Sequence, residues 1–376
     1  MKIVQAYLHK NNWNYSIEKK EINNPLVLVF GERKTLQDQK VIDAINDEFP
    51  YKNIIFGSTA GEILGARVLE NSVTVTALEF QKSDYLIKTA NILDFNKDSK
   101  TLGENLIKQL PAKNLKHIFI ISEGSYVNGS ALIEGIEKHN SKLVKISGGL
   151  CGDNERFDKT LVSFQENPKE GEAVIIGLYG EELEITCASS GGWIPFGPER
   201  IITKSEGNIL YEIDGVPALD IYKKYLGDKA LDLPHSALLF PLNVKAKGKS
   251  YPVVRTILNI NEEDKSMIFA GDVPVQSQVQ LMMASIDAIV EGAGTAAKKA
   301  LEDRKKAPEV ALLISCIGRK LVMDQQTEEE IEEVLTTIGN QTPCTGFYSY
   351  GEIAPHLNEE NCELHNQTMT LTLISE

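Results

Sequence analysis

The chain has 376 residues, of which 42% are hydrophobic and 24% are charged. This composition is typical of a folded globular protein, and the length predicts two domains or one large domain with internal repetition. The formal net charge of −14 argues against a nucleic-acid binder, because a protein that follows the phosphates needs a basic face. The sequence contains no apolar stretch of membrane-spanning length, so we expect no membrane partner.

The five cysteines are scattered along the chain and form no Cys-x-x-Cys pair. They therefore predict neither a disulfide framework nor a zinc ribbon. The first residues lack the apolar core of a signal peptide. We expect a cytoplasmic protein with reduced thiols.

The first predicted unit reads strand, helix, strand, turn, strand. Its strands are expected at 25–30, 53–57 and 72–80, where the sequence is apolar or alternating and rich in β-branched residues. Residues 35–49 carry apolar side chains at helical spacing between the first two strands. Thr35 is the expected N-cap of this helix.

The same order of elements returns from residue 116. Strands are expected at 116–122, 142–149 and 172–180, with a helix at 128–139 after the first of them. This second unit has nearly the same internal spacing as the first, which is a sign of internal repetition.

The middle of the chain does not repeat this order of elements. Residues 214–227 predict a helix that begins at Asp214 and ends at Gly227. Apolar runs near 236–242, 251–260 and 266–272 predict antiparallel strands. A long helix is expected over 276–305, with Val279, Met282 and Met283 on its buried side. We place a domain boundary between residues 222 and 223.

A third unit closes the sequence. Strands are expected at 309–315, 343–351 and 368–374, and a helix at 327–339 begins with a capping box of Thr327 and Glu330. The first glycine after the second strand is Gly57, Gly148 or Gly346 in the three units. The repetition predicts an α/β fold with mixed β-sheets, built from one repeated strand-helix-strand-strand unit and arranged in two domains.

Each unit contains a turn in which a glycine is followed by an acid. These turns are turn 1 (57–62), turn 2 (148–153) and turn 3 (346–352). Glycines at a strand end permit close backbone approach, and the acid can accept hydrogen bonds from an amine or from the loop itself. The turns therefore suit either a ligand site or a tight connection. Turn 3 favours a ligand because Tyr348, Ser349 and Tyr350 add aromatic faces and polar groups before Glu352.

Several motifs together resemble the FIST family of sensory proteins. They read GSTAGEI, SGGLCGDNERFDKTLVSF, YPVVRTIL, AGDVPVQ, ISCIGRK, GFYSYGEIAP and LHNQTMTL, in the order of that family. The resemblance implies a FIST N-terminal domain over 25–222 and a FIST C-terminal domain over 223–376. It also implies a sensor of signal transduction that binds amino acids or related small polar metabolites. Because the chain ends soon after the last strand, we expect a separate signalling output protein as partner.

One branch similar to this family binds haem and senses nitric oxide. That alternative makes His356 or His365 the axial ligand; otherwise we expect no cofactor. His356, Cys362 and His365 lack familiar metal-ligand spacing, so no metal site is expected. No Gly-x-Ser-x-Gly motif of a serine hydrolase is present. A hydrolase that uses Cys316 with His365 is a more distant alternative, because a cysteine at a strand end is more often a buried apolar thiol.

Arg255 lies within a predicted apolar strand, and Arg319 follows the end of another. A buried arginine needs a carboxylate partner, from the protein or from a ligand. For Arg255 the alternatives are a ligand contact or a structural ion pair with Asp272 or Glu352. The predicted ligand-binding residues are Glu352, Ser349, Tyr350, Tyr348, Arg255, Arg319 and Asn366. We predict no catalytic residue. We also predict that Glu352→Gln weakens ligand binding about 10- to 150-fold, whereas Glu62→Gln leaves it nearly unchanged.

Overall fold

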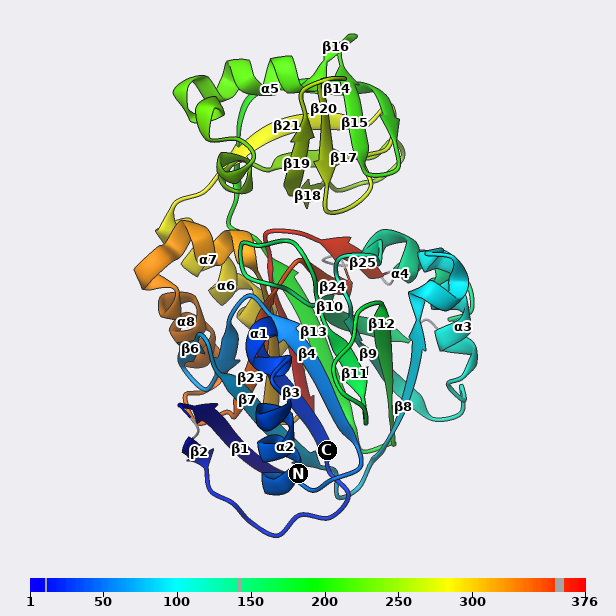
Figure 1. The fold of residues 1–376 in the computed structure, drawn as a ribbon, viewed down its shortest axis with the longest axis vertical. Coiled ribbons are helices and arrows are strands. Elements are labelled where there is room, and N and C mark those ends of the chain that lie inside the picture. Colours follow the sequence, from blue (N-terminus) through cyan, green and yellow to red (C-terminus); the bar gives the residue numbers. More distant parts are fainter. Residues whose placement is uncertain (11, 141–143, 356–361) are drawn as a thin grey trace.

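The computed structural model describes residues 1–10, 12–140, 144–355 and 362–376. The chain forms a large body and a small lobe that sits above one end of it (Figure 1). The body comprises the described residues up to 190 and from 286 onward, and the small lobe comprises residues 194–283. Within the described ranges, every helix is too short or too polar to cross a membrane.

The first sheet of the body is built on the first predicted unit. Its central strands β3 (Leu26–Glu32) and β4 (Ile54–Thr59) are parallel, and β7 (Val73–Glu79) is antiparallel to β3. Helices α1 (Arg33–Leu36) and α2 (Gln39–Glu48) connect β3 to β4. Strands β1 (Lys2–His9) and β2 (Asn12–Ile17) extend the sheet beyond β7.

The second sheet repeats this arrangement. Strands β9 (Leu115–Ser122) and β10 (Lys145–Leu150) are parallel and joined by α4 (Gly129–Glu137), and β12 (Glu172–Tyr179) is antiparallel to β9. Strand β8 (Asp84–Asn91) pairs with β12, in the same position that β1 holds beside β7. The short helix η1 (Ile92–Phe95) and α3 (Ser99–Lys108) precede β9.

The third sheet follows the same plan with chain segments from both sides of the small lobe. Strands β22 (Val310–Cys316) and β23 (Cys344–Ser349) are parallel, and β26 (Met369–Ser375) is antiparallel to β22. The connection contains α7 (Ile317–Met323), η4 (Asp324–Gln326) and α8 (Glu328–Ile338). Strand β13 (Glu184–Ser190) pairs with β26, and α6 (Ile286–Leu301) packs against α8.

Each sheet receives the strand that follows the turn of another unit. Strands β5 (Glu62–Leu64) and β6 (Arg67–Leu69) follow turn 1 and extend the third sheet from β23. Strands β24 (Gly351–Pro355) and β25 (Cys362–His365) follow turn 3 and extend the second sheet from β10. Strand β11 (Val162–Phe164) follows turn 2 and extends the first sheet from β4.

The strand orders confirm the predicted repeat. The three sheets run β11-β4-β3-β7-β1-β2, β25-β24-β10-β9-β12-β8 and β13-β26-β22-β23-β5-β6. The first glycines all lie on the strand of each unit that pairs with a strand from another unit, because Gly57 pairs with Val162, Gly148 with Ile353, and Gly346 with Ile63. In each case the glycine faces the strand that enters from another unit.

The inner faces of the three sheets share one apolar core. This core contains Phe30 of the first unit, Phe119 of the second and Phe347 of the third, all buried. The rings of Phe30 and Phe347 lie 4.7 Å apart between centroids. The helices cover the outer sides, with α3 and α4 on one flank and α6 and α8 on the other (Figure 1). Burial of apolar surface on both faces explains why the central strands are almost continuously hydrophobic.

The small lobe is an eight-stranded antiparallel sheet with one helix. Its strands are β14 (Ile194–Glu206), β15 (Ile209–Ile213), β16 (Val216–Pro217), β17 (Leu242–Lys245), β18 (Val253–Arg255), β19 (Ile257–Asn261), β20 (Ser266–Phe269) and β21 (Gln278–Met283). Helix α5 (Ala218–Leu226) is followed by η2 (Gly227–Asp232) and η3 (His235–Leu239). The predicted antiparallel strands are thus present, although residues 236–239 form a 3₁₀ turn. The predicted boundary between residues 222 and 223 falls within α5.

The predicted helix over 276–305 is wrong in its first part. Val279 and Met282 lie in β21, and α6 begins only at Ile286, where the Ser285 hydroxyl accepts a hydrogen bond from the Ala288 amide. A short apolar run can belong to a strand or to a buried helix, and its spacing alone does not separate the two. Met283 is 48% exposed, so it was not a core residue either.

Two predicted helix caps and one predicted capping box are also wrong. The helix expected from Thr35 is divided into α1 and α2, which begin after Glu32 and Asp38. Asp214 lies in a turn before α5 and accepts the Ile201 amide at 2.9 Å. Thr327 is the N-cap residue of α8, as predicted, but its side chain makes no cap hydrogen bond. Glu330 is buried in the protein interior and does not complete the capping box. In each case a tertiary or turn contact competes successfully with the local capping pattern.

Candidate ligand site between the two lobes

The three turns meet at one end of the body and are joined by backbone hydrogen bonds. The Ala60 amide of turn 1 donates to the Tyr348 carbonyl of turn 3 at 2.8 Å. The Gly152 amide of turn 2 donates to the Ser58 carbonyl of turn 1 at 3.0 Å. The Tyr350 amide donates to the Leu150 carbonyl of turn 2 at 3.0 Å, which closes the ring of contacts. The glycine-acid turns therefore hold the three sheets together.

The acids of turns 1 and 3 are held in the same way by hydroxyl groups. Glu62 accepts hydrogen bonds from Thr59 at 2.5 Å and Ser72 at 2.6 Å. Glu352 accepts hydrogen bonds from Ser349 at 2.6 Å and from the Thr368 hydroxyl at 3.0 Å. Burial raises the pKa of Glu62 to about 8 and the pKa of Glu352 to about 7, because an enclosed carboxylate loses its hydration.

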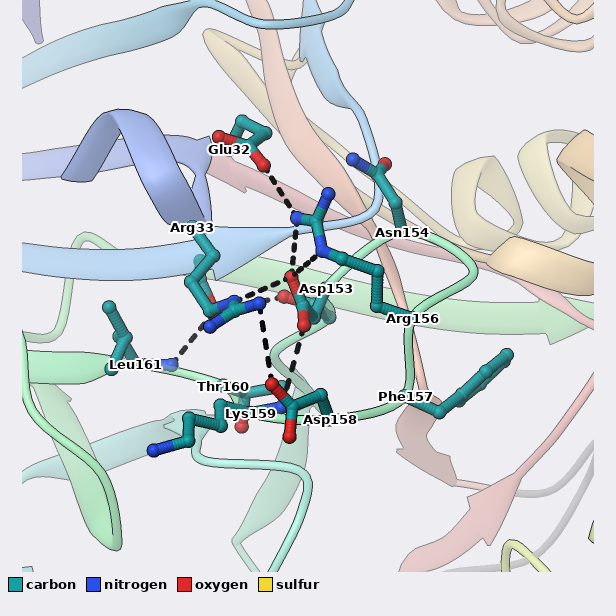
Figure 2. Close-up of polar contacts among 12 residues, drawn as sticks. Glu32, Arg33, Asp153, Asn154, Arg156, Phe157, Asp158, Lys159, Thr160 and Leu161 are labelled. Carbon is teal, nitrogen blue, oxygen red and sulfur yellow. Dashed lines mark hydrogen bonds and ion pairs between the residues drawn. The ribbon is translucent and has the colours of Figure 1, made fainter. Parts of the chain in front are cut away.

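The acid of turn 2 is held by arginines instead (Figure 2). One oxygen of Asp153 lies 2.8 Å from Nε of Arg33 and 2.5 Å from Nη2 of Arg156. Nη2 of Arg156 also lies 2.5 Å from Glu32. Nη2 of Arg33 lies 3.5 Å from Oδ2 of Asp158. This network fixes the loop after turn 2 through charge-assisted hydrogen bonds.

Tyr350 fixes the same loop from turn 3. Its ring stacks on Phe157 with centroids 4.5 Å apart. Its hydroxyl donates to the Asn154 carbonyl at 2.9 Å and accepts the Phe157 amide at 3.1 Å. Asn154 and Phe157 both have positive φ, 49° and 46°, which is uncommon for residues other than glycine. Tyr350 thus stabilises an unusual backbone conformation.

Arg319 joins the two chain crossings between the body and the small lobe. Its guanidinium is fully buried and pairs with Glu330 at 2.6 Å. It also donates to the Gly191 carbonyl before β14 and to the Ile289 carbonyl in α6, the latter at 2.9 Å. Glu330 in turn accepts the Tyr348 hydroxyl at 2.6 Å. A continuous buried polar chain therefore connects the crossings to turn 3.

The structure places four of the predicted ligand residues in the closed interior. Glu352, Ser349, Tyr348 and Arg319 are all 0% exposed and have hydrogen-bond partners within the chain. The described residues bring Arg319 and Tyr348 together on Glu330, while Ser349 and Glu352 form a separate pair. None of the four lines a cavity identified among the described residues. Their direct contact with a ligand stays a prediction.

A cavity of about 420 Å³ lies between the body and the small lobe. The body contributes residues of α4 and β25, and the small lobe contributes β17, β18 and the loops beside them. Its lining residues are Ser130, Ile133, Glu134, Glu137, Val244, Ala246, Lys249, Tyr251, Val253, Arg255, Asp272, Pro274, Cys362, Glu363 and Leu364. Its volume falls in the range of natural small-molecule sites, which often lie at domain interfaces.

Arg255 is the predicted residue that reaches this cavity. Its Nε donates to the Asp272 carbonyl at 3.0 Å and its Nη1 to the Leu364 carbonyl at 2.8 Å. Among the described residues, no carboxylate oxygen lies within 4.0 Å of this guanidinium. The predicted ion pair with Asp272 or Glu352 is therefore wrong, because Arg255 uses backbone carbonyls across the lobe boundary. Burial lowers its pKa below the ordinary arginine value.

A second cavity of about 340 Å³ also lies at the lobe boundary. Glu155, Arg156 and Phe157 come from the loop after turn 2, and Pro234, His235, Leu238, Leu258 and Asn259 come from the small lobe. Tyr350 lies behind this wall through its stacking on Phe157. Asn366 accepts the Thr256 amide at 3.3 Å, so this predicted residue also lies where the two lobes meet.

The described residues of the haem and hydrolase alternatives, His365 and Cys316, have other contacts. His356 lies outside the described residues. His365 is 5% exposed and one ring nitrogen lies 3.1 Å from the Ala354 carbonyl. Burial and the neighbouring Glu352 raise the pKa of the Cys316 thiol well above its ordinary value, which disfavours the nucleophilic thiolate. In the described part of the chain, no group of three or more His, Cys, Asp or Glu residues could hold a metal ion.

Most residues of the larger cavity were not found from the sequence. Glu137 and Glu363, for example, are 226 positions apart and meet only because β25 joins the second sheet beside α4. One sequence feature that indicates this cavity is the group of polar side chains Lys249, Tyr251 and Arg255, which lie close together in the sequence and all line it.

Comparisons with known proteins agree with this architecture. The profile of the FIST N domain matches residues 25–216, and that of the FIST C domain matches residues 218–355. An uncharacterized protein of Methanocaldococcus jannaschii is 23% identical over 380 residues, covering 92% of this chain and 69% of the relative. Uncharacterized proteins from two strains of Mycobacterium tuberculosis are 22% identical over 252 residues, covering 64% of this chain and 63% of each relative.

Proposed function

Because the chain belongs to the FIST family, whose domains are associated with sensory signal transduction, we propose that it is a small-molecule sensor with its ligand site between the lobes. The observation that carries this proposal is the 420 Å³ cavity, which the body and the small lobe close together around Arg255. The expected ligands are amino acids or related small polar metabolites, and the chain acts without chemical conversion of them.

The position of the cavity supports a mechanism for reporting occupancy. A ligand that contacts both lobes binds their closed arrangement better than an open one and shifts the population toward closure. Arg255 already bridges the boundary, since it lies on β18 and donates to Leu364 of β25. We propose that the small lobe moves about the two chain crossings, which Arg319 contacts at Gly191 and Ile289. A cytoplasmic output protein would read this movement.

The test begins with a thermal-shift screen of a metabolite panel on the full chain. For any ligand found, Val253→Trp should abolish binding, because the indole fills the cavity beside Arg255. Leu258→Trp is the matched control, since Leu258 lines the second cavity and not the first. Binding lost only in Leu258→Trp would contradict the proposed site. Small-angle scattering with and without ligand would then measure closure of the lobes.

A further inference from the structure

The chemistry of the cavity specifies the ligand further, on the premise that the proposed function places the ligand there. We infer that the cavity recognises a monocarboxylate with a compact apolar body, that Arg255 binds the carboxylate, and that an amino group on the ligand is not required. This goes beyond the proposed amino-acid class, because binding then requires the carboxylate of the ligand and does not require an amino group.

One cation of the cavity, Arg255, has an unused hydrogen-bond donor in the described structure. Arg255 is 6% exposed, and it lacks a carboxylate within 4.0 Å among the described residues. Its Nε and Nη1 donate to backbone carbonyls, while its Nη2 makes no hydrogen bond in the described structure. A buried guanidinium is stable when an anion matches its charge. The charges of Glu363 and Asp272 favour the guanidinium from a distance. A ligand carboxylate would add the hydrogen-bonded anion that the described residues do not supply.

The acids that line the same cavity already have partners. Glu363 accepts Lys249 at 2.5 Å and Tyr251 at 3.1 Å. Glu137 accepts the Cys362 amide at 3.0 Å, and Asp272 accepts the Asn128 side chain at 3.1 Å.

Glu134, at the exposed rim, pairs with Lys100. Lys249 and Lys100 thus balance the charges of Glu363 and Glu134. Glu137 and Asp272 keep their negative charge, because their donors are neutral groups. Each acid nevertheless has a hydrogen-bond donor within the chain, whereas Nη2 of Arg255 has no acceptor in the described structure.

The remaining walls are apolar. Ile133 of α4 and Leu364 of β25 contribute from the body, and Val244, Val253 and Pro274 contribute from the small lobe. Such walls gain free energy by covering hydrocarbon and lose it when they cover unpaired polar groups. The body of the ligand that fits is therefore a short aliphatic or aromatic chain.

The experiment compares ligands that differ in one group, by calorimetry on the full wild-type chain. The probes are 4-methylpentanoate, its amide, the corresponding 2-oxo acid, and leucine. We expect neither the 2-oxo acid nor leucine to bind more tightly than 4-methylpentanoate, because the apolar walls offer their extra polar groups no partner. The amide should bind about 10- to 150-fold more weakly than 4-methylpentanoate, since it lacks the charge-assisted bond.

Variants of the wild-type chain locate the carboxylate. Arg255→Met should remove the preference for acid over amide, and Arg200→Met, a cation in the small lobe away from the cavity, should retain it. Loss of the preference in Lys249→Met but not in Arg255→Met would overturn the assignment to Arg255. If Arg255→Met does not fold, the acid and amide comparison on the wild type still decides the ligand class.

Other outcomes separate this inference from the proposed function. Equal binding of acid and amide, binding of leucine alone, or no binding of any probe at millimolar concentration would each overturn the monocarboxylate inference. The proposed function would stand in all three cases if another metabolite binds and Val253→Trp abolishes its binding.

Discussion

Turns 1 and 3 differ from turn 2 in how they accommodate a buried acid at the same position of the repeat. Glu62 and Glu352 are surrounded by hydroxyl groups and have a raised pKa, whereas Asp153 contacts two arginines. A protonated carboxyl needs only hydrogen bonds, but a buried carboxylate needs positive charge. The same repeated turn can therefore bury an acid either among hydroxyl groups or against arginines. An acid in such a turn does not by itself indicate a ligand site.

Removal of the charge at turn 2 should have the largest effect. Asp153→Asn leaves Arg33 and Arg156 with reduced compensation in a buried network, and breaking such a network costs about 3 kcal/mol or more. Urea denaturation at neutral pH would measure the change in the free energy of unfolding. Glu352→Gln is the matched control at the equivalent position. A smaller loss for Asp153→Asn than for Glu352→Gln would contradict the distinction between the turns.

The turns also differ in how closely other atoms surround their first glycine, Gly57 in turn 1 and Gly346 in turn 3. A Cβ at Gly346 would lie 1.7 Å from the Leu313 carbonyl oxygen, whereas one at Gly57 would first meet the Cys151 sulfur at 3.0 Å. Gly346→Ala should therefore destabilise the fold by about 1–3 kcal/mol, as expected for a steric conflict in a packed core. Gly57→Ala should cost less, because a side chain can move more easily than a strand. Thermal unfolding of the two variants checks the order.

The hydroxyl-bound acids predict a particular dependence on pH. Their pKa values are raised in the folded state, to about 8 for Glu62 and about 7 for Glu352, so the folded protein keeps protons that the unfolded chain releases. Their contribution to stability is full below the unfolded pKa of about 4.5, and it decreases as the pH rises through the folded values. The decrease is at most about 1.4 kcal/mol per pH unit for each carboxyl.

The variant Glu62→Gln/Glu352→Gln isolates this dependence. Denaturant titrations between acidic and mildly alkaline pH should give a flatter curve for the double variant than for the wild type. Parallel curves would show that the two carboxyls do not hold protons in the folded state. Ligand binding by each single variant also retests the predicted contact at Glu352. A loss confined to Glu352→Gln would support direct contact despite its enclosed position.

The smallest expected effect concerns the contact between turns 2 and 3. Tyr350→Phe removes the hydroxyl that bonds Asn154 and Phe157, which should cost about 0.5–1.5 kcal/mol. The ring stacking on Phe157 is kept, so the loop should retain its place. Hydrogen exchange of the Phe157 amide would report the loss locally. Unchanged protection of that amide would mean that stacking alone fixes the loop.

The sequence by itself determined the repeated unit and its local elements. Strands such as β3, β9 and β22 were predicted to within one or two residues, because buried strands are continuous apolar runs and the intervening helices show clear periodicity. The turns were found from glycine followed by an acid, which reflects a backbone requirement that is local. The same reasoning identified Arg255 as a buried cation in need of an anion.

Only the tertiary structure decided how these parts associate. The strand after each turn joins another unit's sheet, so Glu352 points into a closed junction and β25 brings Glu363 beside α4. Glu330, expected to cap its own helix, instead neutralises Arg319 at the lobe crossings. These outcomes depend on which distant side chain is available at each buried position, and burial and charge compensation across the chain outweigh local preferences worth about 1 kcal/mol.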